Sequence, residues 1–238
     1  MSGFEIKQNV RKLLRDNYPK VFLISLVFIV LMTVMTTLQQ QLPGTFAAYT
    51  QYLDRMSEGE IQSLGTVLSY FKPGGIPFAI VLWLLLPIIE AGYKSYCLKI
   101  SRGQKGDLVD IFNGFLFFGK AILLNIAISF FTTLWTLLFI FPGIAAHYRY
   151  RQAFYILVDD PQKGVLQCIG ESKRMMKGKK LDLFLLDLSF IGWSALHFLT
   201  VLLLPFPFPL PLVLIWLTPY YNLTCAAFYN QLIKELAV

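Results

Sequence analysis

The sequence predicts an all-α membrane protein, a bundle of about six transmembrane helices with amphipathic helices at the membrane surface. Of its 238 residues, 56% are hydrophobic and only 15% are charged, whereas soluble domains average about 45–50% and about 25%. Several apolar stretches are close to the ~20 residues that a helix needs to cross the hydrocarbon core. Basic residues gather between these stretches. The length suits one integral membrane domain over residues 1–238.

The segment 159–180 decides the predicted orientation. It carries six Lys or Arg between two apolar stretches, and cytoplasmic loops near membrane spans collect such residues. With this segment inside, the chain threads the plasma membrane six times and both termini are cytoplasmic. That threading leaves 16 Lys and Arg in the inner segments and 2 in the outer ones. We expect the basic side chains to contact anionic phospholipid headgroups, through Lys173, Arg174, Lys177, Lys179 and Lys180.

The boundaries of the spans follow from the apolar runs and the breaks between them. The six spans are expected at about 20–38, 77–98, 121–141, 143–158, 181–204 and 212–233. Residues 4–18 predict a basic amphipathic helix on the inner surface, and no A-x-A cleavage pattern follows the first span, which we interpret as uncleaved. Residues 39–76 form an outer loop, in which a capping box at 57–60 begins an amphipathic helix.

Two inner segments and one outer turn complete the topology. Residues 99–120 are expected to form a basic loop, and the prolines of 205–211 form a short outer turn. A cytoplasmic amphipathic helix is expected over 160–178. Asp160 suits its N-cap, Pro161 its first helical position and Gly178 its end.

The fourth span is the least apolar. It carries Arg149 and Arg151 after a bend at Pro142-Gly143, and an arginine at mid-bilayer costs roughly 2.5–3.5 kcal/mol. Omitting the span would place the basic segment 159–180 outside the cell. We therefore keep it and expect its arginines to find acidic partners.

Polar side chains form stripes at helical spacing within the apolar runs. The candidates for an intramembrane polar network are Glu90, Lys94, Asn125, Arg149, Arg151, Asp187, Ser194, His197 and Asn222. Because a polar group facing hydrocarbon is costly, we expect the stripes to face one another. Together these facing stripes would form a polar seam inside the bundle. The seam either holds the helices together through hydrogen bonds, which we favour, or forms a pathway or ligand cavity. As a hypothesis, Glu90 pairs with Arg149 and Asp187 shares Arg151, more as a structural lock than as a substrate site.

No pattern of catalytic, cofactor-binding or metal-binding residues emerges. Ser194 and His197 share one helix without an oxyanion motif or an orienting acid, and two histidines are too few for a metal site. The net charge of +7 lies in patches beside apolar spans, so lipid headgroups are expected and nucleic acid is not. Three scattered cysteines imply reduced thiols and no disulfide framework.

From Arg149 onward the chain carries several runs that closely resemble the bacterial "domain of unknown function 975" family. The runs are RYRQAFYILVDDP (149–161), ESKRMMKGKK (171–180), LFLLDLSFIGW (183–193) and TPYYNLTCAAFY (218–229), with SRGQKGDLVDIFNGF (101–115) and FPGI (141–144) before them. The resemblance implies a multi-span membrane protein of Gram-positive-type bacteria without an established activity. A fainter similarity, P-G-I followed by R-Y, is to the membrane domain attached to some glycerophosphodiester phosphodiesterases. Their catalytic domain is not among these residues, so that activity is not implied.

Two functions remain open at this point. The first is a non-enzymatic protein that assembles, anchors or regulates a membrane-protein partner or a second copy of itself in the envelope. The second is a transporter or channel for a small solute or lipid, with the polar seam as its route. No internal repeat supports the second.

Overall fold

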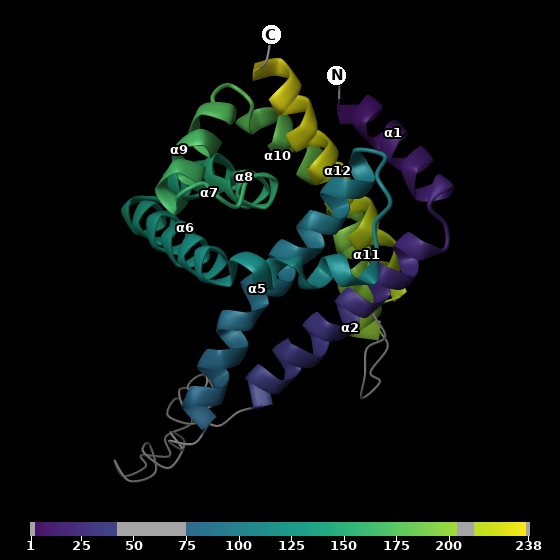
Figure 1. Cartoon of the computed structure of the whole chain (residues 1–238), viewed down its shortest axis with the longest axis horizontal. Helices are drawn as coiled ribbons and strands as arrows, with labels where there is room; N and C mark the ends of the chain where they lie inside the picture. The colour runs from purple at the N-terminus through teal and green to yellow at the C-terminus, as the bar shows by residue number, and fades with distance from the viewer. Residues whose placement is uncertain (1–2, 42–74, 204–211, 237–238) are drawn as a thin grey trace. The chain divides into compact units, whose positions relative to one another are not determined.

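A computed structural model describes residues 3–41, 75–203 and 212–236, and Figure 1 shows them as a set of helices. The elements are α1 (Gly3–Asp16), α2 (Lys20–Gln41), α5 (Gly75–Ser101), η1 (Leu108–Phe117), α6 (Phe118–Leu138), α7 (Ile140–Tyr150), α8 (Ala153–Asp159), α9 (Val165–Met175), α10 (Lys180–Leu188), α11 (Ile191–Leu203) and α12 (Leu212–Leu236). The described residues contain no strand, and the predicted all-α fold is confirmed. The predicted helix of the outer loop and the proline turn lie outside the described residues.

The chain divides into two compact units. The smaller is Val30–Pro87, and the larger combines Met1–Ile29 with Ile88–Val238. In the smaller unit, the described parts of α2 and α5 expose large apolar side chains such as Val34 and Ile80. All the sites described below belong to the larger unit.

Within the described residues, three stretches of helix are long and apolar enough to cross a membrane: Lys20–Gln39, Ile80–Ser101 and Leu108–Leu138. They correspond to the first three predicted spans. The third begins earlier than expected, because the 3-10 helix η1 lies within the predicted loop 99–120 and continues directly into α6.

Helix α5 and η1 approach each other through two glycines. A Cβ at Gly92 would lie 1.7 Å from the Ile111 carbonyl oxygen, and one at Gly114 would lie 1.9 Å from that of Ile88. Each glycine thus faces the backbone of the other element. No larger residue fits at either position without moving the backbone, so these two glycines set the spacing between α5 and η1.

Helices α6 and α7 form a tight antiparallel pair, as a hairpin between the third and fourth spans requires. The bend is at Phe139, whose backbone is extended, and α7 begins directly after it at Ile140. The expected turn at Pro142-Gly143 is therefore wrong by about one turn of helix, because the bend comes earlier in the chain. Gly143 instead allows α7 to pack closely on α6, because a Cβ there would lie 2.2 Å from the Thr136 hydroxyl.

The stretch predicted as the fourth span contains two helices, α7 and α8, with a turn at Arg151 and Gln152 between them. Helix α9 follows and packs on α8. The predicted helix start at Asp160-Pro161 is wrong: α9 begins at Val165 after Gly164. Asp160 instead accepts a hydrogen bond from the Gln162 amide at 3.1 Å, closing a short turn. Gly178 has the expected left-handed backbone, with φ of +79°.

The predicted fifth span likewise contains two helices, α10 and α11, and α12 follows as the sixth. Helix α1 packs against α12 and α10, beside α12 in Figure 1, and buries Ile6, Val10 and Leu14. The Lys7 amine reaches the break between α10 and α11, where it donates to the Ser189 hydroxyl. These three apolar side chains of α1 are thus covered by protein, whereas Phe4 at its start is exposed.

Candidate functional site

A polar cavity of about 310 Å³ lies among α5, α6, α7, α8 and α12. Its charged and polar walls are formed by Glu90, Lys94, Asn125, His147, Arg151 and Asn222. Five of these six side chains belong to the polar network predicted from helical spacing. These side chains thus line one cavity, which is partly open to the surroundings.

Arg151 and Asp187 form the centre of a hydrogen-bond network in this region. The Arg151 guanidinium donates to the Asp187 carboxylate at 2.9 Å and to the Tyr221 hydroxyl. Asp187 also accepts from Tyr148 at 3.1 Å and from Tyr221 at 3.0 Å. Both carboxylate oxygens are thus occupied, and the ion pair joins the turn after α7 to α10 and α12. This is the Arg151–Asp187 contact that the sequence analysis expected.

Glu90 pairs with a different residue from the one predicted. It accepts a hydrogen bond from Lys94, one helical turn further along α5, whereas the Arg149 guanidinium lies over the Trp135 ring, 5.9 Å from its centroid. The predicted Glu90–Arg149 pair is therefore wrong. The side chain of Glu90 is 47% exposed and that of Lys94 only 13%, so the carboxylate is the more accessible half of the pair.

Aromatic rings support both cations. The Lys94 amine lies 4.7 Å from the centroid of Phe154, and the Arg151 guanidinium lies 5.7 Å from that of Tyr221. Such contacts stabilise a partly desolvated cation by about 0.5–2 kcal/mol. The cavity thus contains two cations, each paired with one acid, with one ring beside Lys94 and two beside Arg151.

Ser194, another predicted member, does not join the network. Ser194 donates back to the Phe190 carbonyl oxygen of its own helix at 3.4 Å, and the His197 side chain lies outside the described residues. Tyr148 and Tyr221, which bind Asp187, were not predicted from the sequence. No spacing rule marks a tyrosine as a carboxylate partner, although Tyr221 lies one position before Asn222, which was predicted.

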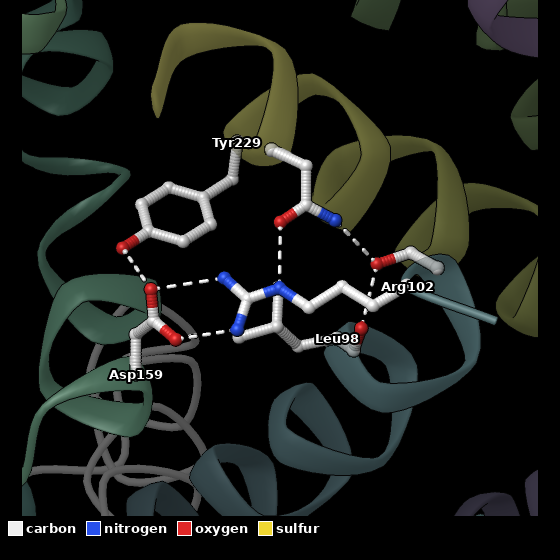
Figure 2. A network of polar contacts seen from close by, with 6 residues as sticks. Leu98, Arg102, Asp159 and Tyr229 are labelled. Atoms are coloured by element: carbon white, nitrogen blue, oxygen red, sulfur yellow. Dashed lines mark hydrogen bonds and ion pairs between the residues drawn. The ribbon is translucent and has the colours of Figure 1, made fainter. Parts of the chain in front are cut away.

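A second polar network joins the ends of α5 and α8 to α12 (Figure 2). Arg102, just past α5, forms an ion pair with Asp159, the last residue of α8, and Tyr229 of α12 donates to the same carboxylate at 3.2 Å. Arg102 also donates to the Asn230 side-chain oxygen at 3.0 Å. Asn230 reaches Ser101 at 2.8 Å. We call Arg102, Asp159, Tyr229, Asn230 and Ser101 the helix-end clamp.

The helix-end clamp changes the acidity of its carboxyl group. Burial opposes the ionisation of Asp159, but hydrogen bonds from Arg102 and Tyr229 and the nearby positive charge outweigh it. The pKa of Asp159 is therefore lower than that of an ordinary aspartate. The contact with Arg102 therefore favours the ionised form of Asp159.

The basic segment 159–180 contains both paired and unpaired cations. Lys179 forms an ion pair with Glu235 at 2.7 Å, and Lys163 forms one with Glu171 at 2.7 Å. The structure shows no acidic partner within the described residues for Lys173, Arg174, Lys177 or Lys180. Lys179 is thus the least available of the five residues predicted to contact lipid headgroups.

Nothing in the described residues forms a group of His, Cys, Asp or Glu suited to a metal ion. Comparison with known protein families gives a match to the C-terminal part of the chain. Residues 139–236 match the model of the family described as "Protein of unknown function (DUF975)". The resemblance predicted from the sequence is confirmed.

The DUF975 match extends from the start of α7 to the end of α12. It includes Arg151 with its partners Asp187 and Tyr221, and Asp159 of the helix-end clamp. Glu90 and Lys94 of the cavity lie before it. No curated protein and no solved structure matches the chain. The DUF975 family is described as having unknown function, so the function proposed below rests on the geometry of the site.

Proposed function

We propose that the chain is a multi-pass protein of the plasma membrane with six spans and cytoplasmic termini. Three helical stretches are apolar and long enough to cross. Large apolar side chains on α6 point away from the protein, including Phe130 at 62% and Leu137 at 84% exposure. Exposed apolar surface of this extent suits contact with lipid tails.

The short helices are compatible with the remaining spans when they are taken in pairs. Helices α7 and α8 together cover residues 140–159, which at 1.5 Å per residue is about 30 Å, the thickness of the hydrocarbon core. In this arrangement Arg151 lies near mid-membrane. Its ion pair with Asp187 supplies the acidic partner that such an arginine requires.

Within this topology we propose that the polar cavity binds a small charged solute for transport and that the protein catalyses no reaction. The observation that supports this is the partly open cavity itself, about 310 Å³. If the polar side chains served only to hold the helices together, we would expect them to fill the space between the helices. The half-exposed Glu90 carboxylate is the group that a solute would meet, since Asp187 is fully occupied by Arg151, Tyr148 and Tyr221.

Uptake into proteoliposomes tests this function. The probes are radiolabelled glycine, methylamine, acetate and phosphate, which cover zwitterions, cations and anions of small size. We expect uptake of one class by the wild-type chain and at least a tenfold loss in Glu90→Gln. Glu235→Gln, which removes an exposed carboxylate outside the cavity, is the matched control and should retain uptake.

The main alternative is the assembly, scaffold or regulatory function. It would be favoured if all four probes failed to enter the proteoliposomes while one membrane protein co-purified reproducibly with the chain. Uptake that is equal in wild type and Glu90→Gln would show that the cavity is not the route.

A further inference from the structure

A separate groove of about 500 Å³ opens between α9 and the end of α12. Its apolar walls are Ile156, Met175, Ile233 and Leu236, and its charged and polar rim is formed by Asp159, Lys163, Glu171, Arg174 and Tyr229. Leu236 is 62% exposed. The groove therefore offers an accessible apolar surface beside a charged rim, and it shares no lining residue with the polar cavity.

The charges on the rim are balanced except for one. Asp159 is held by Arg102 and Tyr229 in the helix-end clamp. Lys163 and Glu171 pair with each other at 2.7 Å. Arg174 is exposed and has no acidic partner among the residues described. The groove thus presents one uncompensated guanidinium at the edge of an apolar surface.

Neighbouring cations strengthen this positive edge. Lys173 precedes Arg174 on α9, and Lys177 lies in the turn that follows the helix. Both are exposed, and neither has an ion-pair partner in the described part of the chain. A guanidinium with ammonium groups nearby favours a phosphate, which it can bind through two parallel hydrogen bonds.

We propose that the groove binds one anionic phospholipid. Its phosphate is held by Arg174 and its acyl chain covers Leu236 and Ile233. The proposal rests on the membrane topology proposed above, which places the ends of α8 and α12 at the cytoplasmic surface where anionic headgroups lie. The apolar walls favour an amphiphile over a free phosphate, because a free phosphate leaves them exposed to water.

Native mass spectrometry of the full chain in neutral detergent tests the site. Phosphatidylglycerol and phosphatidylcholine with identical acyl chains are titrated in parallel, so that only the headgroup charge differs. We expect wild type to retain phosphatidylglycerol preferentially and Arg174→Gln to bind it about fivefold more weakly, the effect of one basic contact near a membrane surface. Arg15→Gln removes an exposed arginine on α1 and should bind as wild type does.

Two further measurements test the contact between the groove and the acyl chain. Glycerol 1-phosphate should compete poorly with the lipid, and Leu236→Gln should weaken retention of phosphatidylglycerol even if Arg174→Gln cannot be purified. The proposal is overturned by equal binding in wild type and Arg174→Gln, by an equal loss in Arg15→Gln, or by full competition from glycerol 1-phosphate. Solute uptake through the cavity should be unchanged in Arg174→Gln, so failure of the lipid site is distinguishable from failure of the proposed transport.

Discussion

The Arg102 guanidinium and the Asp159 carboxylate face each other through two parallel hydrogen bonds, of 2.6 and 2.9 Å, across 57 residues of sequence. This bidentate geometry is the strongest form of the arginine–carboxylate interaction. It fastens the end of α5 to the end of α8, and Tyr229 adds α12 to the same carboxylate. The helix-end clamp thereby fixes three helices at one point.

Loss of the clamp should lower stability in a pH-dependent way. The pKa of Asp159 is lower in the folded chain than the ordinary value of about 3.9. Its ionised form therefore stabilises the folded state at every pH above that ordinary value, and this contribution is lost as the pH falls through the folded-state pKa. We expect Asp159→Asn to cost about 1 kcal/mol at pH 7, because the pair is partly exposed.

Thermal unfolding in detergent between pH 7 and pH 3 measures this difference. The gap in Tm between wild type and Asp159→Asn should be constant near neutral pH and should shrink below about pH 4. Asp160→Asn, which neutralises the adjacent aspartate, is the control. A gap that widens on acidification would contradict the assigned role of Asp159.

Removing the acidic partner of Arg151 should be more damaging. Asp187→Asn leaves a guanidinium that is only about one-fifth exposed without its counter-charge, and breaking such a buried pair costs about 3 kcal/mol. Arg149→Gln should cost much less, because the structure places Arg149 over a ring and not against an acid. Expression level and Tm in detergent compare the two. Equal losses would contradict the assignment of Arg151 as the paired arginine.

The contact between α5 and η1 should tolerate no Cβ at its two glycines. Gly92→Ala and Gly114→Ala each place a methyl group within 2 Å of a backbone carbonyl oxygen, and overpacking of this kind costs about 1–3 kcal/mol. Gly119→Ala is the matched control on α6, where a Cβ meets nothing within 4 Å. That substitution should be neutral or slightly stabilising, since alanine favours helix over glycine. Thermal unfolding of the three variants distinguishes these outcomes.

The all-α fold was predictable because it depends on long apolar runs. The run after Lys20 and the run that ends at Leu138 both appear as helices of the expected kind. The positions at which helices are interrupted were harder to predict. The turn at Arg151-Gln152 contains neither glycine nor proline, and its residues keep near-helical backbone angles. Local sequence therefore carries no signal for it, and packing against neighbouring helices decides where the helix is interrupted.

The candidate site was partly predictable for the same reason. Helical spacing predicted that polar side chains of different spans face one another, and Glu90, Asn125 and Asn222 line one cavity. The partner of Glu90 was available from the sequence as well, because Lys94 lies four residues along the same helix. The pair of Arg102 and Asp159 had no such signal. Its two members end different helices, and only the three-dimensional arrangement shows that those ends meet.

The most direct test of the central claim is the side of the membrane on which residues 160–178 lie. All three native cysteines are buried, so a cysteine introduced at exposed Lys177 can be labelled over a low background. In cells that express Lys177→Cys, a membrane-impermeant maleimide should label the protein only after permeabilisation, whereas Ser57→Cys in the predicted outer loop should be labelled in intact cells. Labelling of Lys177→Cys in intact cells would contradict the six-span topology.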